Sequence, residues 1–154
     1  MKKIIYFLAL IIVTAMSGCS SDDEKNSILV SSEATDCKDN PALMLNTING
    51  ELVYDEYFKY EATTDGGLLI QHINTQHGCD SKIATTAFIK DNVITITENG
   101  NQDANCVCCY DVSMKIGKLK DKQYKIVVYK NSKEYTTLTI DYSSTLKGEY
   151  HITD

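Results

Sequence analysis

The residues most able to do chemistry in this 154-residue chain are its six cysteines. Three of them, Cys106, Cys108 and Cys109, lie within the heptapeptide NCVCCYD, and Cys37 and Cys79 precede them in the chain. Thiols of this kind can form disulfides, bind a metal ion as thiolates, or act as nucleophiles. The choice depends on the cellular compartment and on the strands that bring these residues together.

The sixth cysteine, Cys19, closes a segment that has the pattern of a secretory signal peptide. The stretch MKKIIYFLALIIVTAMSGC has two lysines, then an apolar run over residues 4–13, then small residues. The apolar run is shorter than the roughly 20 residues that a membrane-spanning helix needs. We therefore expect residues 1–18 to be a signal peptide that is removed on export.

Residues 16–19, MSGC, resemble the lipobox of bacterial lipoproteins, with Met16 in the place where leucine is usual. The resemblance implies cleavage before Cys19 and acylation of its thiol, which would hold the chain in a membrane leaflet. The alternative is an ordinary signal peptide followed by a soluble product. The next residues, SSDDEK, are typical of a disordered spacer and resemble the acidic export signal of surface lipoproteins of Bacteroidota. We expect a tether over residues 19–35 and an outer membrane lipoprotein, exposed at the cell surface or otherwise on the periplasmic face.

The charge of the chain argues against nucleic acid as a partner. The formal net charge is −6, and every basic residue is a lysine. Removal of residues 1–18 makes the charge more negative, because that segment holds Lys2 and Lys3 and no acidic residue. A chain without arginine lacks the planar group that binds phosphates in pairs, and a negative field repels nucleic acid. The expected partners are a membrane, through the lipid on Cys19, and a protein or a glycan.

Residues 36–154 are expected to form one all-β domain. From Glu51 onward the sequence alternates with period two and is broken by turn residues, which is typical of an antiparallel sandwich. Leu119 and Tyr124 resemble the tyrosine corner of fibronectin type III and other immunoglobulin-like domains. That resemblance implies a single immunoglobulin-like sandwich of about seven to eight strands. The alternative interpretation is that Tyr124 is an ordinary aromatic residue within a strand and forms no such corner. The predicted strands are 52–60, 68–74, 83–90, 93–98, 107–116, 124–130, 135–140 and 146–152.

In that topology strand 68–74 lies between strands 52–60 and 107–116 and runs antiparallel to both. The end of strand 68–74 then lies beside the start of strand 107–116 and beside the approach to strand 52–60. Five cysteines are therefore expected to gather at this end of the sandwich, together with His77. We call this end the cysteine pole, and its members are Cys37, Cys79, Cys106, Cys108 and Cys109. In an exported protein such cysteines are expected to form disulfides, at most two from five thiols. We expect Cys79 to pair with Cys106 or Cys108, and Cys37 to pair with another cysteine of that strand.

Alternation along strand 107–116 predicts that Cys106 and Cys108 face the core with Tyr110, whereas Cys109 points away. In the same way, strand 68–74 places His72 on the inward face with Leu68, Ile70 and Asn74. We therefore interpret His72 as a hydrogen-bonded core histidine.

The alternative at the pole is a zinc or copper site. Its ligands would be Cys79, Cys106 and Cys108, with His77 or His72. The spacing is unfavourable, because CxCC on an extended strand cannot direct three sulfurs at one ion and no CxxC pair is present. A catalytic cysteine has less support, because the nearby His77 and Asp80 give no reason to expect the geometry of a base and its orienting group. No phosphate-binding loop or nucleophile elbow occurs, so we expect no enzyme and no cofactor.

Most of the region from Asp36 onward is similar to a group of small Bacteroidota surface lipoproteins of unknown function. The residues that carry the resemblance are DCK at 36–38, IQHIN at 70–74 followed by Cys79, CVCCYD at 106–111 and IGKLKDKQYKI at 116–126. The resemblance implies an immunoglobulin-like sandwich in the cell envelope and no known activity. The function expected from the sequence is a lipid-anchored, non-catalytic binding module. The alternative is a metal or thiol-redox protein that uses the cysteine pole.

Overall fold

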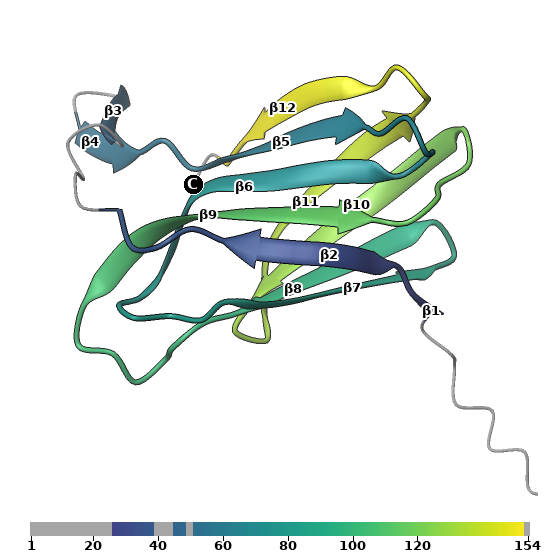
Figure 1. Ribbon diagram of the computed structural model, residues 1–154. Coiled ribbons are helices and arrows are strands. Elements are labelled where there is room, and N and C mark those ends of the chain that lie inside the picture. The colour runs from purple at the N-terminus through teal and green to yellow at the C-terminus, as the bar shows by residue number, and fades with distance from the viewer. Residues whose placement is uncertain (1–25, 39–44, 49–50, 153–154) are drawn as a thin grey trace, which may run out of the picture.

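The computed structural model describes residues 26–38, 45–48 and 51–152 of the chain. These residues form strands and no helix, in two layers that lie face to face (Figure 1). The expected signal peptide and Cys19 lie outside the described residues. Where the chain is described, no helix has the length and apolarity to span a membrane. The strands are β1 (Asn26–Ser27), β2 (Leu29–Ala34), β3 (Leu45–Ile48), β4 (Glu51–Tyr54), β5 (Tyr57–Ala62), β6 (Leu68–Gly78), β7 (Ala84–Lys90), β8 (Val93–Asn99), β9 (Val107–Ile116), β10 (Lys122–Lys130), β11 (Lys133–Tyr142) and β12 (Lys147–His151).

Two five-stranded sheets make the sandwich. Sheet A has the order β1-β7-β8-β10-β11 and sheet B the order β12-β5-β6-β9-β2, while β3 and β4 form a separate hairpin. The expected position of β6 between β5 and β9, antiparallel to both, is confirmed. The expectation of a wholly antiparallel sandwich is wrong at one ladder, because β10 runs parallel to β8. The chain leaves β8, crosses to sheet B as β9 and returns as β10, and parallel neighbours need such a crossover.

The hairpin turns of sheet A follow from their residues. Asp91 and Asn92 join β7 to β8, and both have positive φ angles, 49° and 66°. Asn131 and Ser132 join β10 to β11 with φ angles of 48° and 68°. Two-residue turns with both central residues at positive φ match the twist of the strands they connect, and Asn and Asp tolerate that conformation. Both turns lie in gaps between predicted strands, the first between 83–90 and 93–98 and the second between 124–130 and 135–140.

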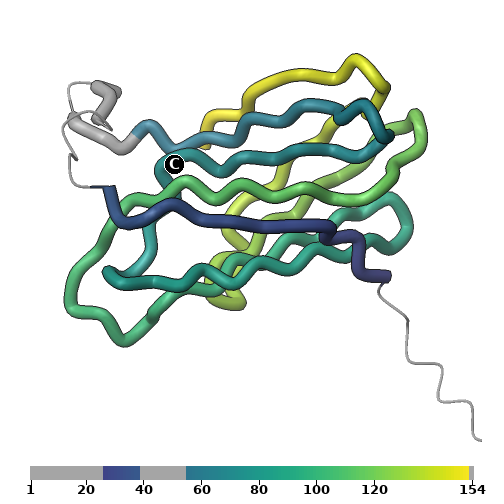
Figure 2. Tube along the Cα trace, viewed as in Figure 1, coloured from purple at the N-terminus to yellow at the C-terminus, as the bar shows by residue number. Residues whose placement is uncertain are grey.

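The core lies between the two sheets and is filled by the inward-facing residues of alternate positions. The tube in Figure 2 shows the two layers that enclose it. Tyr124 is buried at the start of β10, and its hydroxyl accepts a hydrogen bond of 3.1 Å from the backbone N–H of Lys120. Leu119 packs against the same core. These are the contacts expected of a tyrosine corner. Among the described residues, the apolar side chains with 0% of their surface exposed are Leu68, Ala87, Ile94, Ile96, Val112, Ile116 and Val128.

Residues 26–34 were expected in the tether, but they form β1 and β2. β1 pairs with β7 in sheet A and β2 pairs with β9 in sheet B, so this segment passes from one sheet to the other. The burial pattern of β2 is exposed at all but its first residue, so it lacks the alternation that marks a strand in sequence. Its order comes from ladder hydrogen bonds to β9 instead. The predicted single strand 52–60 is also different in the structure, where this region forms two strands, β4 and β5.

Candidate functional site

Two disulfides form at the cysteine pole. Cys37 is bonded to Cys108, and Cys79 is bonded to Cys106. Both pairs agree with the pairing expected from the strand order. The first bridge ties the segment after β2 to β9 across 71 residues, and the second ties the end of β6 to the approach to β9 across 27 residues. Each bridge is expected to stabilise the fold by about 2–4 kcal/mol, mainly by restricting the unfolded chain.

The register of β6 and β9 sets the direction of each sulfur. Cys108 lies opposite the inward-facing His77, and Cys109 lies opposite Gln76 on the other face of the sheet. Opposed residues of an antiparallel pair share a face, so Cys108 points inward and Cys109 outward, as expected. Cys106 was expected to face the core, but it is exposed, because β9 begins only at Val107.

Cys109 is the free cysteine among the described residues, and it is buried although it faces away from the core, with 5% of its surface exposed. The segment Thr35–Lys38 runs beside it, and the backbone N–H of Lys38 donates to the carbonyl of Cys109 at 3.0 Å. Burial, with a smaller contribution from Glu56, raises the pKa of its thiol. A buried thiol with a raised pKa is a poor nucleophile.

The zinc or copper alternative requires thiolates, whereas three of its proposed ligands are bonded to other sulfurs here. Cys79, Cys106 and Cys108 are all in disulfides. In the described part of the chain, no three His, Cys, Asp or Glu side chains are arranged to hold a metal ion. A metal at the pole would therefore require reduction of both bridges first.

A second cluster of ionisable side chains lies inside the sandwich, beside the cysteine pole. Its members come from both sheets, and we call it the buried charge cluster: Glu56, His72, His77, Glu98 and Lys130. The two histidines are on β6, Glu56 directly precedes β5, Glu98 is on β8 and Lys130 ends β10. His72 and Glu98 have no exposed surface.

A bulge in β6 explains why both histidines point inward. His72 and His77 are five residues apart, so a regular strand would direct them to opposite faces. The pairing of β6 with β9 shifts between His72 and Thr75, and Asn74 has a φ angle of 58°. One extra residue at a bulge reverses the alternation that follows. Asn74 was expected to share the face of His72, but it is turned away and donates through Nδ2 to the carbonyl of Asp55.

His72 is held between two carboxylates. Its Nδ1 lies 3.0 Å from Glu98 Oε2, and its Nε2 lies 2.9 Å from Glu56 Oε1. Burial acts against a charge on the ring, but Glu98 and Glu56 outweigh it and raise the pKa of His72. Nδ1 has hydrogen-bond geometry toward Glu98, whereas Nε2 meets Glu56 as a close ion pair without a hydrogen bond. The raised pKa favours the imidazolium form of His72, which has no lone pair for a metal ion.

Each carboxylate has further partners. Lys130 Nζ lies 3.1 Å from Glu56 Oε1, and the Tyr135 hydroxyl donates to Glu56 Oε2 at 2.8 Å. Burial acts to raise the pKa of Glu56, but His72, Lys130 and Tyr135 together lower it. For Glu98 too, burial acts to raise the pKa, and His72 with His77 lowers it to about 2. Two carboxylates face His72 and Lys130, so the charges of these four side chains balance.

His77 completes the cluster on the side of the pole. Its Nε2 lies 3.7 Å from Glu98 Oε2 and 3.4 Å from the hydroxyl of Thr75. Its Nδ1 is buried without a hydrogen-bond partner in the described part of the chain. Gly100 packs against this ring so closely that a Cβ there would lie 2.5 Å from Nδ1. His77 thus joins the pole through its ladder position opposite Cys108, and its ring is directed at Glu98.

The sequence interpretation found His72 as a core residue but missed its partners. Glu98 carries a signal that could have found it, since it continues the inward positions of Ile94 and Ile96 along β8. Glu56 and Lys130 carry none, because they stand at strand ends, where charged residues are ordinarily solvated.

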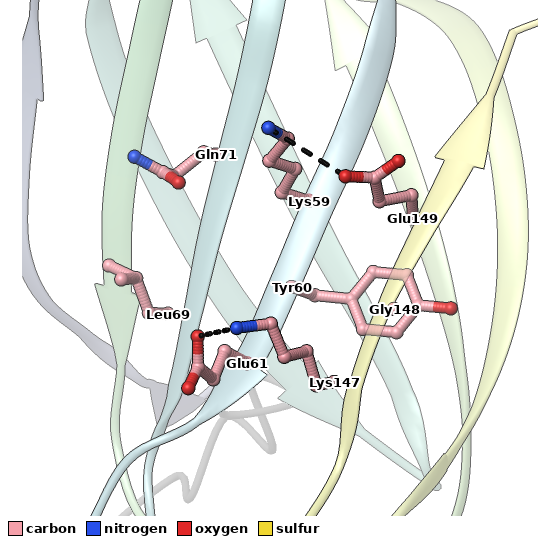
Figure 3. A pocket seen from close by; sticks show the side chains of 8 residues that line it. All are labelled: Lys59, Tyr60, Glu61, Leu69, Gln71, Lys147, Gly148 and Glu149. Atoms are coloured by element: carbon pink, nitrogen blue, oxygen red, sulfur yellow. Dashed lines mark ion pairs between the residues drawn. The ribbon is translucent and has the colours of Figure 1, made fainter.

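The outer face of sheet B carries a shallow hollow that is open to solvent (Figure 3). Two ion pairs cross it: Lys59 lies 3.7 Å from Glu149, and Lys147 lies 3.3 Å from Glu61. Beside it the ring of Tyr57 stacks on His151, with ring centroids 4.9 Å apart. The lining residues are Lys59, Tyr60, Glu61, Leu69, Gln71, Lys147, Gly148 and Glu149.

In comparisons with known proteins, the chain matches no protein-family model, no curated protein and no solved structure.

Proposed function

We propose that the protein is an exported, lipid-anchored binding module of the outer membrane that does no chemistry of its own. The observation that carries the proposal is the pair of disulfides at the cysteine pole, which use four cysteines as staples. Disulfides form and persist in oxidising compartments outside the cytoplasm. That compartment agrees with the signal peptide and with the lipobox that ends at Cys19.

The interior supports a structural role for the histidines. His72 lies within ion-pair distance of Glu56 and of Glu98, and its contact with Glu98 joins sheet B to sheet A. We expect this cluster to make the packing of the two sheets specific.

The binding surface that we propose is the hollow on the outer face of sheet B. It combines a half-buried apolar side chain, Leu69, with an amide and paired charges, and the Tyr57–His151 stack lies beside it. Flat aromatic groups next to polar side chains suit a glycan or a protein loop. The partner on this proposal is an extracellular or envelope protein or glycan.

The anchor is tested in cells that process lipoproteins. The full chain should partition into the membrane fraction, Cys19→Ser should move it to the soluble fraction, and Cys109→Ser should leave it in the membrane. Protease added to intact cells should remove the wild-type domain if it is on the surface. A Cys19→Ser chain that stays in the membrane would contradict the anchor.

The binding face is tested with detergent-solubilised full chain on arrays of bacterial and host glycans and on immobilised envelope proteins. Leu69→Glu should abolish any binding seen with the wild type. Thr139→Glu, at an exposed position of β11 in the other sheet, is the matched control and should bind normally. Equal binding by both variants would exclude the hollow.

A further inference from the structure

The two disulfides at the cysteine pole touch each other. Sγ of Cys79, bonded to Cys106, lies 3.3 Å from Sγ of Cys108, which is bonded to Cys37. Thiol–disulfide exchange proceeds by attack of a thiolate on a disulfide sulfur, so its rate depends on access to that sulfur. A thiolate on Cys79 would already be in contact with the sulfur it must attack.

The four bonded cysteine residues differ in exposure. Cys106 is exposed, whereas Cys37, Cys79 and Cys108 are half-buried. An external thiol therefore reaches the Cys79–Cys106 bridge at Cys106. The sulfur displaced by that attack is Cys79, which is the one in contact with Cys108.

We infer that the four bonded cysteines form one exchange unit, in which attack by a small-molecule thiol on Cys106 produces a Cys79–Cys108 bridge and releases Cys37. In the first step the external thiolate bonds to Cys106, and the electron pair of the broken bond leaves on Cys79. In the second step the Cys79 thiolate bonds to Cys108, and the electron pair of that bridge leaves on Cys37. The Cys37 thiolate then takes a proton, and the external thiol stays bonded to Cys106.

The surroundings of Cys37 allow this release. An open hollow adjoins it, lined by Asp36, Cys37, Asp80, Ser81, Lys82 and Tyr110. The segment Thr35–Lys38 is held to β9 by backbone hydrogen bonds and by Lys38 Nζ, which contacts Asp111. Exchange frees this segment from its covalent attachment to Cys108, within β9. The pole is then a redox-sensitive clamp, which goes beyond the binding function proposed above.

Two variants that each remove the same bridge test the inference. Cys106→Ser leaves the thiol on Cys79, in contact with Cys108, and Cys79→Ser leaves it on Cys106. Trypsin places Cys37 in peptide 26–38, Cys79 in peptide 60–82 and the cysteines of NCVCCYD in peptide 91–115. Exported full-length chains are purified, alkylated and digested without reduction, and mass spectra show which peptides are linked.

In Cys106→Ser we expect peptide 60–82 joined to peptide 91–115 through Cys108, with Cys37 alkylated. Alkylated Cys37 should exceed that in Cys79→Ser at least about tenfold, because a thiol held in contact competes at a high effective concentration. The inference is overturned if Cys106→Ser keeps the Cys37–Cys108 link and carries alkylated Cys79.

Limited treatment of the wild type with glutathione gives the same answer without a variant. The first alkylated peptide should be 26–38, together with glutathione on Cys106, and early alkylation of peptide 60–82 instead would overturn the inference. If all five cysteines of the pole are alkylated in the wild type before any thiol is added, the two disulfides are absent. That result would overturn both the proposed function, which rests on these disulfides, and the exchange unit. Intact bridges with no exchange would overturn the exchange unit alone.

Discussion

The Nδ1 atom of His72 lies 3.0 Å from Oε2 of Glu98, and neither side chain has any exposed surface. His72 is in sheet B and Glu98 is in sheet A, so this ion pair joins the two layers through the core. Oε1 of Glu56 lies 2.9 Å from the other ring nitrogen of His72, Nε2. Buried ion pairs add little when complete but are expensive to break, because removal of one partner leaves an unpaired charge.

The buried charge cluster should give stability a defined pH optimum. The pKa of Glu98 falls from 4.5 to about 2 on folding, so its contribution is complete above pH 4.5 and is lost as the pH falls toward 2. The pKa of His72 is raised above 6.5, so its contribution is complete below pH 6.5 and is lost as the pH rises through the raised value. The melting temperature, followed by circular dichroism, should be highest between pH 4.5 and 6.5. A melting temperature that climbs steadily above pH 6.5 would contradict this prediction.

Replacement of His72 by leucine should destabilise the protein strongly. His72→Leu leaves Glu56 and Glu98 buried without their shared cation, and we expect a loss of about 3–5 kcal/mol in the free energy of unfolding. Lys147→Met breaks only a surface pair with Glu61 and should lose less than about 1 kcal/mol. Urea denaturation measures both. A His72→Leu chain as stable as Lys147→Met would show that the buried charge cluster does not hold the sheets together.

The sequence predicts the strands of this fold better than it predicts the cluster within it. Alternation locates β6 to β11, and residues that tolerate positive φ locate the turns at 91–92 and 131–132. These signals are local. The parallel pairing of β8 with β10 depends on which sheet each strand joins, and no local pattern encodes that choice.

The missed features share a physical cause. The bulge at Asn74 reverses the facing of every later residue of β6, and a single asparagine is its only mark in the sequence. β2 is ordered by hydrogen bonds to its neighbour, so its own side chains carry no pattern. Strand order predicts that Cys79 and Cys37 pair with cysteines near the start of β9, but it leaves open which partner each one takes. That choice, and the contact between the two bridges, require the side-chain positions.

Alanine at Gly100 should destabilise the protein through His77. The new Cβ would lie 2.5 Å from Nδ1 of His77, whose ring is confined by Glu98 and Thr75. We expect Gly100→Ala to lose about 1–3 kcal/mol in urea denaturation, as overpacked sites do. Gly117→Ala is the matched control, because the nearest atom to its Cβ is 3.4 Å away, and it should stay within about 1 kcal/mol of the wild type. Equal stability of the two variants would mean that His77 can move.

Cys109 should resist alkylation as long as the protein is folded. Its side chain is buried, and burial raises the pKa of its thiol, so both access and the reactive thiolate are restricted. At about pH 8, reaction with iodoacetamide should be at least about a hundredfold slower in buffer than in urea, because it must wait for an opening of the structure. Thr139→Cys in a Cys109→Ser background supplies an exposed thiol for comparison and should react at similar rates in both solvents. If Cys109 in the folded protein reacts as fast as the thiol at position 139, then the segment Thr35–Lys38 leaves β9 readily. The hydrogen bond from Lys38 to Cys109 would then contribute little to holding it there.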